Sequence, residues 1–162
     1  MTDAASPVED DHRMLTRIAD YQFGAGAGEA LFGESDLEIT RSTSGRPRQV
    51  HVPAGRLVTY NTDGRFTLGV EGGRRIADAL AGPAYRVVVG DDSEPFVREG
   101  RNVFAKFVQT VDPDVRPDDE VVVVHEDGDV LGVGRAELPA SDMREFETGM
   151  AVFVRHGAGS DD

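Results

Sequence analysis

The 162-residue sequence predicts an α+β protein made of two small domains. Two observations predict this fold class. Between residues 37 and 70, four short segments favour strands, and their connections are too short for a crossover helix, so we expect an antiparallel four-stranded meander flanked by helices. After residue 83, short strands alternate with glycine turns and two short helices, a pattern typical of a small closed or partly closed β-barrel.

The first half begins with an acidic leader, residues 1–11, that we expect to be disordered. The spacing of Met14, Leu15 and Ile18 then predicts a helix over residues 11–22. A second short helical turn is expected at 29–32. The expected strands cover residues 37–41, 49–52, 56–60 and 65–70, with an Asp-Gly hairpin turn at 61–64. A helix over 71–81 is expected to end at Gly82-Pro83.

Three glycines, Gly24, Gly26 and Gly28, follow the first helix. A dinucleotide-binding loop needs a strand before its glycines and a βαβ unit around them. Here a helix precedes the glycines and antiparallel strands follow them. We therefore interpret the three glycines as a flexible joint that lets two helical pieces pack closely.

The second half opens with a strand at 84–89. Ser93 is expected to cap a short helix that starts with Glu94 and Pro95 and ends at a left-handed Gly100. A strand at 103–108 and an acidic loop at 110–119 follow. The remaining expected elements are strands at 120–124 and 130–138, a helix at 142–148 capped by Ser141, a last strand at 150–155 and a disordered tail from 156.

The charge of the chain is strongly acidic and unevenly distributed. The net charge is −13, and Lys106 is the single lysine among 17 basic residues, a composition that predicts a halophilic, archaeal protein. An ordinary acidic protein is the alternative. Residues 41–75 nevertheless hold seven arginines against two acidic residues. This basic island is consistent with a face reserved for an anionic partner, and chance clustering on solvated strands is the alternative.

Several classes of function find no support in the sequence. The absence of cysteine excludes disulfides and thiolate metal sites. The four histidines are far apart and show no metal-ligand spacing, and no serine has a nucleophile-elbow context. We expect no catalytic residue, no metal and no cofactor, although a small enzyme with an unrecognised site stays open as a third hypothesis. No apolar run approaches ~20 residues, so we expect a cytoplasmic protein without a membrane partner.

The stretch VVVGDDSEPFVREGRNVFAKFV, residues 87–108, organises the second half. Its glycine turn, Gly100-Arg101-Asn102-Val103, places bare backbone beside Arg98, Arg101 and Lys106. Backbone N–H groups and cationic side chains together suit a phosphate backbone. The stretch therefore predicts a surface for nucleic acid.

Several motifs resemble a known family in the expected order. The segments EPFVREGRNVFAKFV (94–108), DPDVRPDDEVVVVHEDGDVLGVGRAEL (112–138) and GMAVFVR (149–155) resemble the PUA domain that ends archaeosine tRNA-guanine transglycosylases. DYQFGAGAGEALF (20–32) resembles the start of the domain that precedes PUA in these enzymes. The resemblance implies a leader (1–11), a pre-PUA domain (12–82), a PUA pseudo-barrel (83–157) and a disordered tail (158–162).

The resemblance also implies an RNA-binding surface, formed in PUA domains by the first helix, the glycine turn with the following strand, and the last strand. The matching residues here are Arg98, Gly100, Arg101, Asn102, Val103, Phe104, Ala105, Lys106 and Arg155. Arg135 is expected to add a contact, and Arg46 and Arg48 are candidates on a loop of the basic island. Core packing is the alternative for Phe104 and Val103.

The function implied by the resemblance is non-catalytic RNA binding, with tRNA as the partner. In the related transglycosylases this end grips the acceptor stem and 3′ end, so we expect support of tRNA modification such as archaeosine formation, together with a separate modifying enzyme. DNA is not expected as a partner. The family's catalytic aspartates and zinc ligands lie on a barrel domain that nothing here matches. The alternative is a protein-docking accessory subunit of a tRNA-guanine transglycosylase or archaeosine synthase.

Overall fold

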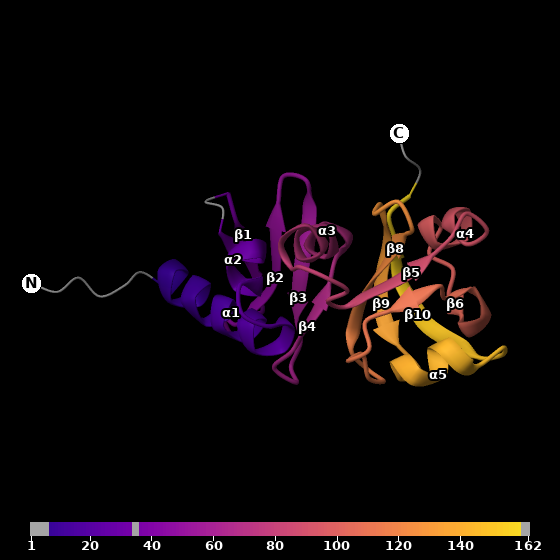
Figure 1. Cartoon of the computed structure of the whole chain (residues 1–162). Coiled ribbons are helices and arrows are strands. Elements are labelled where there is room, and N and C mark those ends of the chain that lie inside the picture. The colour runs from indigo at the N-terminus through magenta and orange to yellow at the C-terminus, as the bar shows by residue number, and fades with distance from the viewer. Residues whose placement is uncertain (1–6, 34–35, 160–162) are drawn as a thin grey trace, which may run out of the picture.

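The computed structural model describes residues 7–33 and 36–159, which form two α+β domains side by side (Figure 1). The first domain contains α1 (Pro7–Phe23), α2 (Ala27–Phe32), β1 (Glu38–Arg41), β2 (Pro47–Val52), β3 (Gly55–Tyr60), β4 (Phe66–Leu68) and α3 (Val70–Ala79). Its sheet has the order β1-β2-β3-β4 with antiparallel neighbours. The expected four-stranded meander flanked by helices is confirmed.

Several boundaries of the first domain differ from the expected ones, since α2 begins at Ala27, β2 begins at Pro47 and α3 ends at Ala79. α1 begins at Pro7, so residues 7–11, which we expected in a disordered leader, are helical, and residues 1–6 lie outside the described part of the chain. β4 ends at Leu68 because α3 starts at Val70, where the Gly73 N–H already donates to the Gly69 carbonyl at 2.9 Å.

The joint between α1 and α2 is built from glycines, as expected. Gly24 and Gly26 have φ of +102° and +93°, the left-handed region that favours glycine. A Cβ at Gly28 would lie 2.5 Å from the Thr16 side chain, and the Gly28 N–H donates to Asp20 Oδ1 at 2.7 Å. The glycines therefore reverse the chain and allow α2 to pack closely on α1.

The second domain is a curled six-stranded sheet with short helices at its rim (Figure 1). Its elements are β5 (Arg86–Val89), α4 (Glu94–Arg98), β6 (Val103–Phe104), the 3₁₀-helix Ala105–Phe107, β7 (Thr110–Val111), β8 (Glu120–His125), β9 (Val130–Ala136), α5 (Ala140–Glu145) and β10 (Met150–Gly157). The strand order is β6-β10-β9-β8-β5-β7, with β5 and β8 parallel. No helix in the described ranges is long and apolar enough to span a membrane.

The strand expected at 103–108 is the largest error in the second domain. β6 ends at Phe104 and pairs with β10, whereas β7 pairs with β5 on the opposite edge of the sheet. The chain must cross between these edges within a few residues, so it turns through the 3₁₀-helix Ala105–Phe107. Residues 110 and 111, expected in a loop, form β7, which is too short to leave a pattern in the sequence.

The last elements are also shifted from their expected positions. α5 starts at Ala140, directly after Pro139, so Ser141 lies inside the helix instead of capping it. Pro139 is the N-cap residue, with φ −68° and ψ 159°, and its carbonyl accepts the N–H groups of Asp142 and Met143 at 3.0 and 3.1 Å. β10 continues to Gly157, so residues 156 and 157 of the expected tail belong to a strand, and residues 160–162 lie outside the described ranges.

The two hydrophobic cores differ in composition. In the first, Phe23, Phe32 and Phe66 are buried, and Val122 and Val133 of the second domain pack into the same cluster. The second core is built mainly of valines, with Leu131, Met143 and several alanines. All five phenylalanines of the second domain are at least 39% exposed, namely Phe96, Phe104, Phe107, Phe146 and Phe153. The aromatic rings of these phenylalanines thus lie on the surface.

Helix α3 packs closely against strands of both domains. A Cβ at Gly72 would lie 2.0 Å from the Leu57 carbonyl oxygen in β3, and a Cβ at Gly73 would lie 2.5 Å from Val133 Cγ1 in β9. Because neither approach leaves room for a side chain, the two glycines set how deeply α3 lies between the sheets.

Replacing Gly72 by alanine should therefore destabilise the protein. The methyl group would overlap backbone, which cannot rotate away, so we expect Gly72→Ala to lower the free energy of unfolding by about 1–3 kcal/mol. Arg74→Ala, on the exposed face of the same helix, is the matched control and should change it little. Denaturant titration followed by circular dichroism measures both, and equal stability of Gly72→Ala and wild type would show that α3 can shift freely.

Candidate nucleic-acid interface

The turn after α4 ends the helix in a Schellman motif. Gly100 has φ +93°, its N–H donates to the Val97 carbonyl at 2.8 Å, and the Arg101 N–H donates to the Phe96 carbonyl at 2.9 Å. The left-handed glycine that we expected is therefore present. However, the N–H groups of Gly100 and Arg101 are used by the helix, so they are not free donors for a phosphate as we expected from the sequence.

The residues after Gly100 fix the surface to the sheet. Asn102 Oδ1 accepts a hydrogen bond from the Val154 N–H of β10 at 2.9 Å. Val103 and Ala105 are buried in the valine-rich core, whereas Phe104, between them, points to solvent. Core packing was the alternative for both residues. It is confirmed for Val103 and wrong for Phe104.

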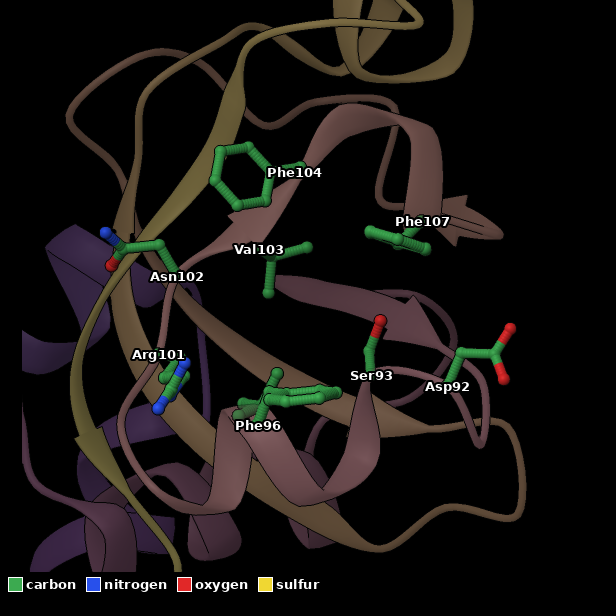
Figure 2. Close-up of a pocket in the computed structure, with 9 residues that line it drawn as sticks. Asp92, Ser93, Phe96, Arg101, Asn102, Val103, Phe104 and Phe107 are labelled. Carbon is green, nitrogen blue, oxygen red and sulfur yellow. The ribbon is translucent and has the colours of Figure 1, made fainter.

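A largely apolar pocket of about 620 Å³ lies between α4 and the segment 101–107 (Figure 2). Its walls are Asp92, Ser93, Phe96, Val97, Arg101, Asn102, Val103, Phe104 and Phe107. Phe96 forms one wall, while Phe104 and Phe107 stand across the opening from it (Figure 2). Three exposed aromatic rings around one cavity make this pocket a candidate binding site.

Two cationic side chains accompany these rings. The Arg101 guanidinium carbon lies 5.8 Å from the centre of the Phe96 ring, and Lys106 Nζ lies 5.0 Å from the centre of the Phe107 ring. The Arg101 side chain is 69% exposed, and its ion pair with the equally exposed Glu99 spans 3.7 Å. Both cationic groups can therefore reorient toward an anionic ligand at the pocket.

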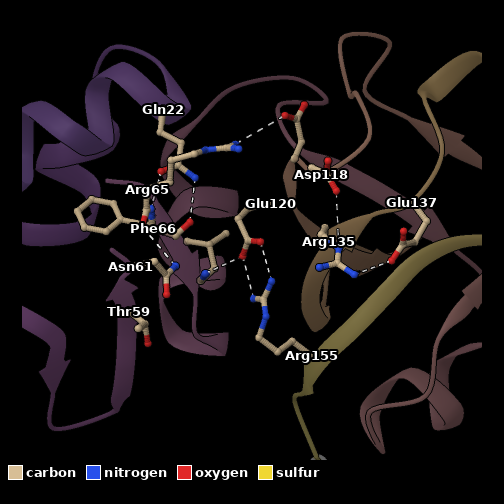
Figure 3. A network of polar contacts seen from close by, with 12 residues as sticks. Gln22, Thr59, Asn61, Arg65, Phe66, Asp118, Glu120, Arg135, Glu137 and Arg155 are labelled. Carbon is tan, nitrogen blue, oxygen red and sulfur yellow. Dashed lines mark hydrogen bonds and ion pairs between the residues drawn. The ribbon is translucent and has the colours of Figure 1, made fainter. Parts of the chain in front are cut away.

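Two other predicted residues, Arg98 and Arg155, are held by carboxylates. Arg98 pairs with Glu94 at 3.1 Å within α4 and is nearly buried. Arg155 donates to both oxygens of Glu120, at 2.8 and 2.6 Å (Figure 3). Glu120 is 5% exposed and also accepts from the Leu68 N–H of the first domain at 2.8 Å. The Leu68 N–H bond to Glu120 thus joins the two domains, and Arg155 neutralises Glu120 from within the second domain.

The remaining predicted residues lie away from the pocket. Arg46 stacks on Tyr60 at 4.1 Å, and it also donates to the Asn61 carbonyl. Arg48 is exposed on β2 and not on a loop as we expected. Arg135 pairs with Glu137 at 2.9 Å and lines a second cavity of about 380 Å³ at the domain junction, near Asn61 and Arg155 (Figure 3). The basic island therefore does not gather beside Arg101.

Sequence reasoning missed Phe96 and Phe107 as pocket residues and Phe153 as an exposed ring. A signal was present, since each has a charged residue within two positions and the buried positions nearby are valines. Sequence reasoning also missed that Asp91, Glu94 and His125 lie with their polar atoms within 4.8 Å of one another. His125 Nε2 contacts Asp91 at 2.6 Å, while Arg98 pairs with Glu94. These contacts fasten the start of α4 to the β8–β9 hairpin.

The electrostatics of His125 follow from these carboxylates. Its pKa is raised above the ordinary 6.5, first by the hydrogen bond to Asp91, against some desolvation, and then by Asp127 and Glu94. His156 behaves in the opposite way, since burial and then the charges of Arg56 and Arg155 lower its pKa. Protonation of His125 therefore stabilises the folded state, whereas protonation of His156 destabilises it.

Loss of Glu120 should weaken the junction between the domains. In Glu120→Ala the Arg155 guanidinium and the Leu68 N–H lose their partner, so we expect a loss of roughly 2–4 kcal/mol in the free energy of unfolding. Glu137→Ala, which removes an exposed partner of Arg135, is the control and should cost under about 1 kcal/mol. Chemical denaturation checks both, and similar values for the two variants would contradict the role assigned to Glu120.

The raised pKa of His125 predicts a pH dependence. Its contribution to stability is complete below the unfolded value near 6.5 and is lost as pH rises through the folded pKa. Above the unfolded value near 6.5, His156 is increasingly neutral in both states, so the free energy of unfolding of the wild type should fall as pH rises through the folded pKa of His125. His125→Gln should flatten this fall, while His156→Gln should not. An unchanged slope in His125→Gln would refute the prediction.

Comparisons with known sequences agree with this architecture. Residues 13–83 match the family described as the patch-forming domain C2 of tRNA-guanine transglycosylase, and residues 85–158 match the PUA domain. The chain is 46% identical over 146 residues to a tRNA-guanine(15) transglycosylase of Thermococcus kodakarensis, covering 90% of this chain and 25% of that protein. For the same enzyme of Pyrococcus furiosus the identity is 48%, over 88% of this chain and 24% of that protein. The chain thus spans about a quarter of the length of these curated relatives.

Comparisons with solved structures support the fold. A hypothetical protein from Pyrococcus horikoshii superposes with a TM-score of 0.72 at 22% identity, covering 94% of this chain and 92% of that one. A conserved PUA domain protein from Thermoplasma acidophilum gives 0.66 at 20% identity, with 94% and 91% covered. The chain therefore belongs to the PUA-domain proteins, with a tRNA-guanine transglycosylase C2 domain before its PUA domain, and it corresponds to the C-terminal region of the archaeal transglycosylases.

Proposed function

We propose that this protein binds tRNA without catalysing a reaction, and that the pocket between α4 and residues 101–107 holds the unpaired 3′ end. One observation carries the proposal. The second domain buries no phenylalanine, and three of its five exposed rings surround a cavity that also has Arg101 at its edge. Unpaired bases are bound in proteins by stacking on aromatic rings and arginine planes.

Stacking suits the charge of this chain better than phosphate attraction does. With a net charge of −13, the protein as a whole repels a polyanion, and only local groups favour RNA. We infer a halophilic protein from its acidic, lysine-poor composition, and in concentrated salt the attraction of Arg101 and Lys106 for phosphate is screened. The rings then supply most of the affinity, because stacking depends little on salt.

The predicted site residues take three roles in this proposal. Arg101, Lys106 and Phe104 contact RNA directly, since all three are exposed around the pocket. Gly100, Asn102, Val103 and Ala105 shape the turn that carries them. Arg98 and Arg155 hold the neighbouring elements through their carboxylate partners. Arg135, Arg46 and Arg48 lie outside the pocket, and we propose them for contacts with more distant parts of the RNA.

The names of the relatives indicate the biological setting. They are tRNA-guanine(15) transglycosylases, and this chain matches a quarter of their length. We therefore propose a cytoplasmic protein that supports tRNA modification, such as archaeosine formation, beside a separate catalytic enzyme. A second candidate is an accessory subunit that docks onto such an enzyme and contacts no RNA by itself, since residues 13–83 and 85–158 match domains of these relatives.

Binding of deacylated tRNA tests the proposal. In molar potassium chloride, fluorescence anisotropy should show saturable binding that weakens when the 3′-terminal nucleotides are removed. Because the charges are screened in this salt, replacing both cationic residues, Arg101→Ala with Lys106→Ala, should cost in total no more than the roughly 1–3 kcal/mol of one charged hydrogen bond. Arg144→Ala, exposed on α5 and not part of the pocket wall, is the control and should bind like the wild type.

Two outcomes would count against the proposal. Equal binding of intact and truncated tRNA would show that the pocket does not hold the 3′ end. Absence of binding to any RNA, in salt where circular dichroism shows the folded protein, would favour the docking subunit. A pull-down with the transglycosylase of the same cell would then be expected to retain that enzyme without RNA.

A further inference from the structure

Phe153 is an exposed aromatic residue that the pocket does not use. It lies in β10 between Val152 and Val154, which are buried, so its ring points to solvent and is 42% exposed. Strands alternate their side chains between two faces, so this position belongs to the outer face of the sheet. A large exposed ring on the solvent face of a strand is available to contact a ligand.

The register of the sheet places Phe153 on the same face as the rim of the pocket. β6 pairs with β10 so that Val103 lies opposite Val152, and both are buried. Phe104 and Phe153, which follow these two valines, share the solvent face of the sheet but lie on either side of this pair, because the strands are antiparallel and Phe104 is opposite Met150. The hydrogen bond from the Val154 N–H to Asn102 Oδ1 fixes the pocket wall against the same part of β10. The rings of Phe104 and Phe153 thus stand on two neighbouring strands.

Arg135 of β9 forms a row with Phe153 of β10 across the two strands. It lies opposite Phe153 in the β9–β10 pair, and its guanidinium carbon is 5.4 Å from the centre of the Phe153 ring. Glu137 at 2.9 Å and Asp118 at 4.0 Å hold the guanidinium. Beyond Arg135 the row reaches the junction cavity that Arg65 and Arg155 also line.

The charges around Arg135 indicate whether a base or a phosphate group would bind at this row. Two carboxylates lie close to the Arg135 guanidinium, so its attraction for a phosphate is largely cancelled. Its planar face remains suited to stacking, as does the exposed ring of Phe153. A base fits this chemistry, whereas a phosphate group does not.

We infer that Phe153 and Arg135 form a stacking platform for an unpaired base next to the one held in the pocket. This inference rests on the proposed function and extends it, because the platform would bind a second unpaired nucleotide beside the terminal one. RNA with several unpaired 3′ nucleotides would engage both the pocket and the platform, and RNA with one would engage the pocket alone.

Two RNA hairpins of identical stem, with 3′ overhangs of one and four nucleotides, separate these contacts. Phe153→Ala should weaken binding of the four-nucleotide overhang about 5- to 150-fold, the effect of losing one stacked base, and should leave the one-nucleotide overhang unchanged. The slope of log Kd against log salt should stay the same, because no phosphate contact is lost. Phe153→Tyr should restore binding, since it keeps the ring.

Phe146→Ala is the matched control, because Phe146 is 44% exposed and follows α5 instead of lying on the sheet. Equal effects of Phe153→Ala and Phe146→Ala, or an equal loss for both overhangs, would overturn the platform. If Phe96→Ala weakens both RNAs while Phe153→Ala weakens neither, the platform fails and the proposed function stands. If the wild type binds neither hairpin, both fail.

Discussion

Glu120 of the second domain joins the two domains, because it accepts the Leu68 N–H of the first domain while it stays paired with Arg155 of its own. It stands at the start of β8, accepts from the backbone of β4, and is neutralised by Arg155 of β10. A buried carboxylate is costly unless it is paired and fully hydrogen-bonded, so the position of every one of these strands is coupled to the others. Helix α3, pressed against β3 and β9 at Gly72 and Gly73, adds the apolar part of the same junction.

This junction also explains how the surface around α4 is placed. Strand β10 holds Asn102 through the Val154 N–H, and Phe153, the residue before Val154, lies on the solvent face. Because Val152 and Val154 are buried in the valine-rich core, the backbone of β10 is fixed. The rim of the pocket is therefore tied to the same strand that carries Arg155 and closes the domain junction.

Local patterns predicted much of the fold, whereas features that depend on distant atoms were missed. The meander follows from short connections, and the left-handed Gly100 follows from its place after a short helix. The start of β6 was predicted, but its end at Phe104 and the whole of β7 were not, because they depend on partner strands near opposite edges of the sheet. Likewise, the sequence located the turn at Gly100, but not the use of its N–H groups by α4 or the pairing of Arg155 with Glu120. The exposed positions of Phe96, Phe107 and Phe153 were missed although charged neighbours gave a signal, since phenylalanine is ordinarily a core residue.

The valine-rich core of the second domain has a consequence for how such a protein can change. Its buried positions are filled by small side chains, mostly β-branched, that pack on one another without any aromatic ring. The phenylalanines on the surface can therefore be exchanged for other residues without opening cavities in the interior. Ligand preference can drift on the outside of this domain while its folding stays the same, so one scaffold can come to serve different ligands.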